Sequence, residues 1–143
     1  PHHISGQQQR QQIDSSRKVE LRFLTTAEAN LPWVFASDSH LKHIHPGASL
    51  QWRIYMKNKD SQKITARLSL SLSPGLAAPY IQLKQNIQPT VTLARAEEKT
   101  LYFSAQVAKN IPKNMQQVVL SYTLFPLKAF YQRQHISGGS SHD

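Results

Sequence analysis

The chain has 143 residues, of which 39% are hydrophobic and none is cysteine. A domain of this length buries a core without cross-links, and the lack of thiols excludes disulfides and thiolate metal sites. Lys and Arg outnumber Asp and Glu by 17 to 8, which gives a formal net charge of +9 at pH 7. Because this charge is spread along the chain and not gathered among aromatic residues, it favours an anionic membrane surface or an acidic protein patch over nucleic acid. The alternative, which is equally consistent with the sequence, is that the charge only keeps the domain soluble.

The composition divides the chain into a tail, a body and a tail. Residues 1–16 include a glutamine-rich run, and residues 128–143 end in a stretch of Ser and Gly. Both tails are predicted to be flexible, because their composition does not supply enough apolar surface to order them. Residues 17–127 are predicted to form one domain of the size of a β-sandwich.

Apolar and polar residues alternate with a period of two over most of the body, as they do in strands that bury one face. Turn residues separate these segments, and none of them carries a sustained helical stripe. The pattern predicts an all-β fold, an immunoglobulin-like antiparallel β-sandwich. Strands are expected at 18–23, 41–45, 50–57, 67–73, 80–83, 90–93, 101–107 and 118–124. The expected core includes Trp33, Trp52, Ile54, Leu68, Leu70, Phe103, Leu120 and Tyr122.

Three histidines, His40, His43 and His45, form the best candidate for a metal site. His43 and His45 are two residues apart on an expected strand, so their side chains share a face. Imidazole binds Cu(II) and Zn(II) well, and Cu(I) in some settings. The other interpretation, which we favour, is that histidines near a turn are solvated, because no cysteine or carboxylate completes the ligand set.

The sequence does not carry the motifs of a catalytic site. It contains no cysteine nucleophile, no Gly-x-Ser-x-Gly elbow, no His-Glu-x-x-His pair and no phosphate-binding glycine loop. We therefore expect that the protein is not an enzyme.

Four short motifs, taken in order over the body, resemble one known family. They are Leu31-Pro32-Trp33-Val34-Phe35, His45-Pro46-Gly47, Ala78-Pro79-Tyr80, and the closing segment 118–126. Together they resemble the periplasmic copper-chaperone domain of the CtaG family. That resemblance implies an immunoglobulin-like sandwich in a membrane-anchored factor that delivers copper to the haem-copper centre of cytochrome c oxidase.

The chain departs from this family at the residues that hold the metal. The family carries a Cys-Phe-Cys-Phe motif shortly after the Pro-Tyr pair, and its two thiolates bind Cu(I). Counted from Tyr80, those two positions are Asn86 and Gln88 in this chain. Amide side chains are poor ligands for the soft Cu(I) ion, so the site does not carry over.

The resemblance and the departure together lead to one main expectation and two alternatives. The main expectation is an oxidase assembly factor that has lost the thiolate copper site and contacts an oxidase subunit or another assembly factor. Its domain is expected in the periplasm, with a single inner-membrane anchor upstream of this chain. One alternative is a metallochaperone that binds copper through His40, His43 and His45, and the other is an unrelated immunoglobulin-like interaction module.

Overall fold

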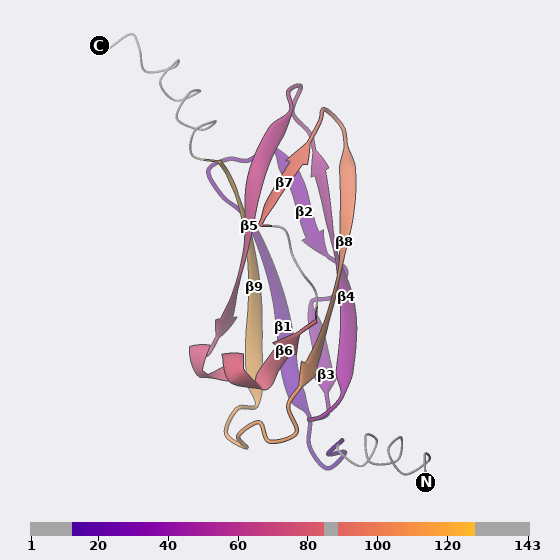
Figure 1. Ribbon diagram of the computed structural model, residues 1–143, viewed down its shortest axis with the longest axis vertical. Helices are drawn as coiled ribbons and strands as arrows, with labels where there is room; N and C mark the ends of the chain where they lie inside the picture. The colour runs from indigo at the N-terminus through magenta and orange to yellow at the C-terminus, as the bar shows by residue number, and fades with distance from the viewer. Residues whose placement is uncertain (1–12, 85–88, 128–143) are drawn as a thin grey trace, which may run out of the picture.

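The computed structural model describes residues 13–84 and 89–127, which fold into two facing β-sheets (Figure 1). The strands are β1 (Val19–Ala27), β2 (Trp33–Ser37), β3 (Leu41–Ile44), β4 (Ser49–Asn58), β5 (Ile64–Ser73), β6 (Ile81–Leu83), β7 (Thr90–Leu93), β8 (Glu98–Val107) and β9 (Gln117–Pro126). One sheet has five strands in the order β3-β1-β9-β5-β7, and the other has four in the order β2-β4-β8-β6. The predicted all-β sandwich is confirmed.

The core lies between the sheets and is built from the apolar face of each alternating strand. In β9, every second residue from Val118 to Leu124 is fully buried, while the residues between them are half-buried. All the residues predicted for the core are buried except Leu70, which is half-buried and packs against its edge. The reason is that β7 pairs only with the first residues of β5, Ile64–Arg67, which leaves Leu70 on a part of β5 that has β9 alone as a neighbour.

Four aromatic side chains join the two sheets at the centre of this core. Phe23 and Tyr122 come from the five-stranded sheet, whereas Trp52 and Phe103 come from the four-stranded sheet. Ring centroids lie 5.0 Å apart for Phe23 and Trp52, and 5.1 Å apart for Phe103 and Tyr122. The indole N–H of Trp52 donates a hydrogen bond of 3.2 Å to the Tyr122 hydroxyl. Burial raises the pKa of Tyr122 well above its ordinary range, so this hydroxyl stays neutral.

One strand pair runs parallel, in a sandwich whose other pairs are antiparallel. Strand β1 pairs with β9 in parallel from Glu20 to Ala27. Parallel neighbours need a long connection, and these two strands stand near the opposite ends of the described chain (Figure 1). The alternation of apolar residues predicts which face of a strand is buried but not the direction of its neighbour.

Two elements were not among the expected strands. Strand β2 begins at Trp33, which is buried, and places Phe35 half-buried on the same face. A 3-10 helix, η1 (Gly75–Tyr80), follows β5 where only a turn was expected, and it buries Ala77. No helical segment within residues 13–84 and 89–127 has the length and hydropathy of a membrane span.

A buried asparagine fixes the two turns at the upper end of Figure 1. Asn58, which is fully buried, donates from Nδ2 to the carbonyl oxygens of Gln62 at 2.8 Å and Leu93 at 3.0 Å. Its Oδ1 accepts a hydrogen bond of 2.8 Å from the Asp60 main chain. Because Gln62 belongs to the β4–β5 turn and Leu93 ends β7, one side chain holds both sheets together at this end.

Candidate functional site

The two positions of the family's copper-binding thiols, Asn86 and Gln88, lie outside the described residues. The described residues on either side show which strand each end of the intervening connection is bonded to. The main-chain N–H of Lys84 donates to the Ser104 carbonyl of β8 at 3.0 Å, and the Pro89 carbonyl accepts from Leu68 of β5 at 2.7 Å. The chain therefore leaves one sheet at Lys84 and joins the other at Pro89.

The three histidines of the proposed metal site face different partners. The Nε2 atom of exposed His43 lies 3.7 Å from a carboxylate oxygen of Glu20 on β1. The Nδ1 atom of half-buried His45 lies 2.7 Å from the Arg17 main-chain carbonyl oxygen. His40 is exposed before the start of β3. Within the part of the chain that the structure describes, no three histidine or carboxylate side chains are gathered closely enough to hold a metal ion.

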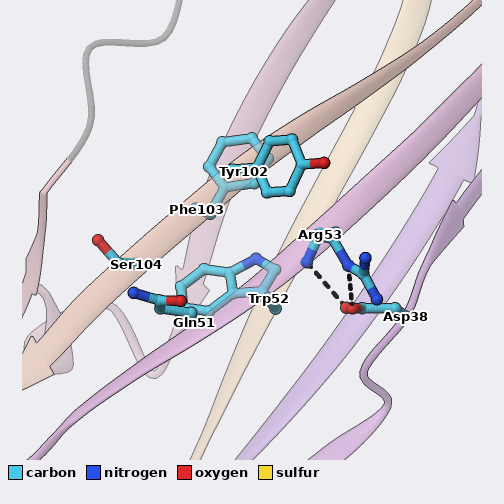
Figure 2. A pocket seen from close by; sticks show the side chains of 7 residues that line it. All are labelled: Asp38, Gln51, Trp52, Arg53, Tyr102, Phe103 and Ser104. Carbon is cyan, nitrogen blue, oxygen red and sulfur yellow. Dashed lines mark hydrogen bonds and ion pairs between the residues drawn. The ribbon is translucent and has the colours of Figure 1, made fainter.

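A groove of about 440 Å³ opens on the outer face of the four-stranded sheet. It is lined by Asp38, Gln51, Trp52, Arg53, Tyr102, Phe103 and Ser104. Figure 2 shows Arg53 and Tyr102 at one end of this groove, and Gln51 and Ser104 at the other. These residues are opposite each other in the register of β4 and β8, so the groove lies across the middle of that strand pair.

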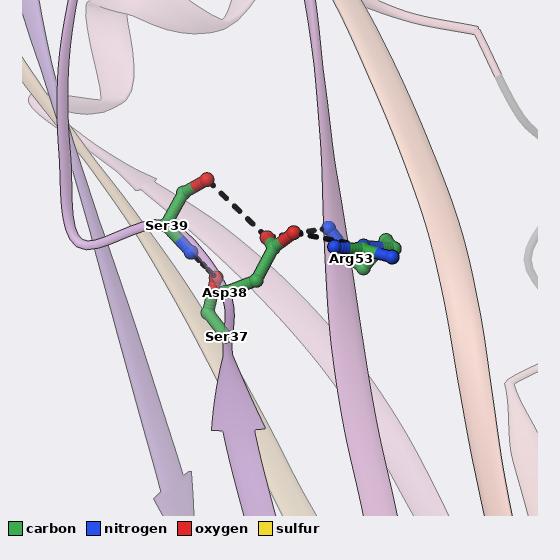
Figure 3. Close-up of polar contacts among 4 residues, drawn as sticks. All are labelled: Ser37, Asp38, Ser39 and Arg53. Carbon is green, nitrogen blue, oxygen red and sulfur yellow. Dashed lines mark hydrogen bonds and ion pairs between the residues drawn. The ribbon is translucent and has the colours of Figure 1, made fainter.

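The groove is bounded by the end of β2. Asp38, the residue after β2, continues the pairing with β4 through hydrogen bonds to Arg53. The Asp38 main-chain N–H donates to the Arg53 carbonyl at 2.9 Å, and its Oδ1 accepts from the Arg53 main-chain N–H at 2.8 Å. Its Oδ2 accepts from Arg53 Nε at 2.9 Å. Figure 3 shows that Ser39 supports the same carboxylate, with its hydroxyl 3.3 Å from Oδ1, and donates its main-chain N–H to Ser37 Oγ at 3.1 Å. The guanidinium of Arg53 is therefore held in a fixed direction beside the groove.

These contacts shift the pKa values of Asp38 and Arg53 in opposite directions. Hydrogen bonds from Arg53, the main-chain one foremost, hold the pKa of Asp38 below its ordinary value of 3.8. In turn, the Asp38 carboxylate holds the pKa of Arg53 above its ordinary range. The pair stays ionised over the physiological range, so the groove presents an oriented cation next to an exposed phenol, that of Tyr102.

Sequence reasoning did not assign a role to Arg53 or Tyr102. Both occupy outward positions on expected strands, which was visible in the alternation of residues 50–57 and 101–107. Their meeting depends on the register of β4 and β8, with Arg53 opposite Tyr102. Residues so far apart in the sequence give no local signal of that contact.

Comparison with known proteins places this scaffold in a family. The family model of the cytochrome c oxidase assembly protein CtaG/Cox11 matches residues 2–126, which is most of the chain. The chain belongs to the CtaG/Cox11 family. A curated relative, the cytochrome c oxidase assembly protein CtaG of Mesorhizobium japonicum, is 26% identical over 118 residues. That match covers 78% of this chain and 57% of the relative, so the chain spans little more than half of the relative's length.

The resemblance to the CtaG family inferred from the sequence is thus confirmed, and the chain that matches the family contains no cysteine. The match to the CtaG/Cox11 family runs through every strand from β1 to β9. The scaffold of the family is present without any thiol.

Proposed function

We propose that this chain is the domain of a cytochrome c oxidase assembly factor that acts through protein contacts and has lost the thiolate copper site. The observation that carries the proposal is the family match over residues 2–126 in a chain without cysteine. Cu(I) is a soft ion that prefers thiolate or thioether ligands. Asn86 and Gln88 offer only amides in their place.

The same proposal includes the setting and the kind of activity. The domain lies in the periplasm, carried by an inner-membrane anchor upstream of residue 1, and it performs no catalysis. The net charge of +9 supports contact with an anionic membrane surface or an acidic protein. Among the described residues, Asp38 is the carboxylate nearest to the three histidines in sequence. Its oxygens accept hydrogen bonds from the main-chain N–H and the side chain of Arg53, so Asp38 is already engaged away from the histidines.

The test is oxidase assembly in the organism that encodes the protein. Deletion of the gene should lower the level of assembled, active cytochrome c oxidase, and the full-length wild-type gene should restore it. A deletion strain with normal oxidase would contradict the proposal and favour an unrelated interaction module.

The same strain separates the proposal from a metallochaperone that uses histidine. A variant with His43→Ala and His45→Ala should restore the oxidase as well as the wild type does. If that variant folds, reaches the membrane and fails to restore the oxidase, the histidines carry the function and the proposal is wrong.

A further inference from the structure

The loops at the two ends of the sandwich differ in charge. The lower end in Figure 1 is made by residues 13–18, the β3–β4 turn at 45–48, residues 74–80 with η1, and the β8–β9 turn at 108–116. These segments carry one carboxylate, Asp14, and four cations, Arg17, Lys18, Lys109 and Lys113. The turns of the upper end, at 28–32, 59–63 and 94–97, carry three cations and three carboxylates. Within the described residues, the loops of the lower end are therefore basic and those of the upper end are balanced.

Main-chain hydrogen bonds join the segments of the lower end. The Asp14 N–H donates to the Pro46 carbonyl at 2.8 Å, which ties the segment before β1 to the β3–β4 turn. The Ala108 N–H donates to the Tyr80 carbonyl at 2.8 Å, which ties the β8–β9 turn to η1.

Arg17 connects these two pairs of segments. Its guanidinium donates from Nη1 to the Ile111 carbonyl at 2.7 Å and from Nη2 to the Pro112 carbonyl at 2.9 Å. The side chain of Arg17 is thus engaged with the β8–β9 turn, and the exposed cations of the lower end are all lysines. The four segments form one surface on which these lysines are displayed.

The most exposed large apolar side chain of the described residues lies at the same end. Leu76 of η1 is 77% exposed, and η1 contains no charged residue. Ala78 of η1 and Lys109 line the same hollow, so η1 lies next to the basic β8–β9 turn. An apolar side chain among lysines is typical of a surface that lies on a bilayer, because the apolar group enters the headgroup region while the cations stay at the phosphates.

We propose that the lower end of the sandwich is a docking surface for an anionic lipid bilayer. Lys18, Lys109 and Lys113 contact lipid phosphates, and Leu76 enters the boundary between headgroups and acyl chains. The described part of the chain begins at Ile13, at this same end. The lower end is therefore the part of the domain nearest along the chain to the proposed upstream anchor, and the inference rests on the proposed function only for that anchor.

The kind of cation favours lipid over an acidic protein. Lys is depleted in protein interfaces, whereas Arg and Tyr are enriched there. The lysine ammonium is a compact, strongly hydrated charge on a flexible stem, which suits a fluid layer of phosphates without fixed geometry. Arg17, the arginine of this end, directs its guanidinium to main-chain carbonyls instead.

Vesicle binding by the full 143-residue chain tests the inference. The purified chain is sedimented with vesicles of phosphatidylcholine alone, or of phosphatidylcholine mixed with phosphatidylglycerol, and the bound fraction is measured. The chain should bind the mixed vesicles and not the neutral ones. Binding should weaken as salt is added, because salt screens exposed charges.

Two double variants of equal net charge test the position of the surface. Lys18→Gln with Lys113→Gln removes two exposed cations from the lower end, and Lys59→Gln with Lys63→Gln removes two from the upper end. The lower pair should weaken binding to the mixed vesicles about tenfold, because each lysine near the lipid surface adds to the attraction. The upper pair should weaken it by less than about twofold, because its charges lie far from the lipid and are screened.

A pair of leucine variants tests the apolar contact in the same assay. Leu76→Ser should weaken binding about threefold, because it removes the side chain that enters the headgroup region. Leu24→Ser is the control, since Leu24 is also exposed, at 53%, but lies on the outer face of β1. It should leave binding unchanged. Circular dichroism checks that each variant is folded.

Each outcome decides the question. The inference is overturned if the wild-type chain does not bind the mixed vesicles, if both lysine pairs weaken binding equally, or if both leucine variants do. If the deletion strain lacks oxidase but the chain does not bind the mixed vesicles, the inference fails while the proposed function stands. If the lower end binds lipid as expected but the deletion strain has normal oxidase, the inference stands and the proposed function fails.

Discussion

Replacing Asn58 by Ala should destabilise the domain far more than an exposed Asn→Ala change. The side chain makes three hydrogen bonds, to the carbonyls of Gln62 and Leu93 and from the Asp60 N–H. A buried polar group that loses its partner costs about 1–3 kcal/mol. Because water can reach the partly buried contacts at Gln62 and Asp60, only the Leu93 carbonyl bears the full cost of losing its hydrogen-bond partner. The expected loss in the free energy of unfolding is therefore about 2–4 kcal/mol, which corresponds to a melting temperature roughly 10 °C lower.

Urea denaturation followed by tryptophan fluorescence measures this loss. The transition should move to lower urea with an unchanged slope, because the surface exposed on unfolding is the same. Asn114→Ala, at an exposed turn position, is the control and should change the free energy by less than about 0.5 kcal/mol. If Asn58→Ala is as mild as this control, the account of Asn58 as the link between the two turns is wrong.

Three further predictions concern other contacts. Tyr122→Phe leaves the buried Trp52 N–H without its acceptor and should lower the free energy of unfolding by about 1–2 kcal/mol in the same assay, whereas an unchanged value would show that the bond contributes nothing. Because the folded-state pKa of Asp38 is lowered, its contacts with Arg53 stabilise the fold above pH 3.8 and are lost as the pH falls further. Asp38→Asn should therefore lose less stability than the wild type on acidification below that pH, and equal losses would contradict the ion pair. His43→Ala should leave Zn(II) uptake by calorimetry unchanged, and the loss of a stoichiometric site would contradict the geometry around Glu20.

The strands and the core could be predicted because their signal is local. Leu and Ser alternate in β5, and Leu120, Tyr122 and Leu124 alternate with Ser121 and Thr123 in β9, so the local pattern indicates the buried face of each strand. Leu70 shows where this reasoning stops. Its position in the alternation is correct, but its half-burial depends on how far β7 extends along β5.

The groove and the strand directions could not be predicted because they depend on long-range pairing. Nothing near Asp38 in the sequence indicates that its carboxylate bonds to the main chain of Arg53, 15 residues away. The spacing of His43 and His45 suggested one shared site, but His45 contacts the Arg17 carbonyl and His43 faces Glu20 on a neighbouring strand. The family resemblance supplied what the alternation did not, since it depends on the order of motifs along the chain.

The central claim is that this chain keeps the scaffold of the CtaG/Cox11 family without a thiolate copper site, and competition for Cu(I) tests it most directly. The purified chain is loaded with Cu(I) and challenged with a strong Cu(I) chelator, beside a reduced variant with Asn86→Cys and Gln88→Cys as the thiolate control. The wild-type chain should lose all of its copper to the chelator at concentrations at which the control retains the metal. Retention of one equivalent of Cu(I) by the wild-type chain would contradict the claim.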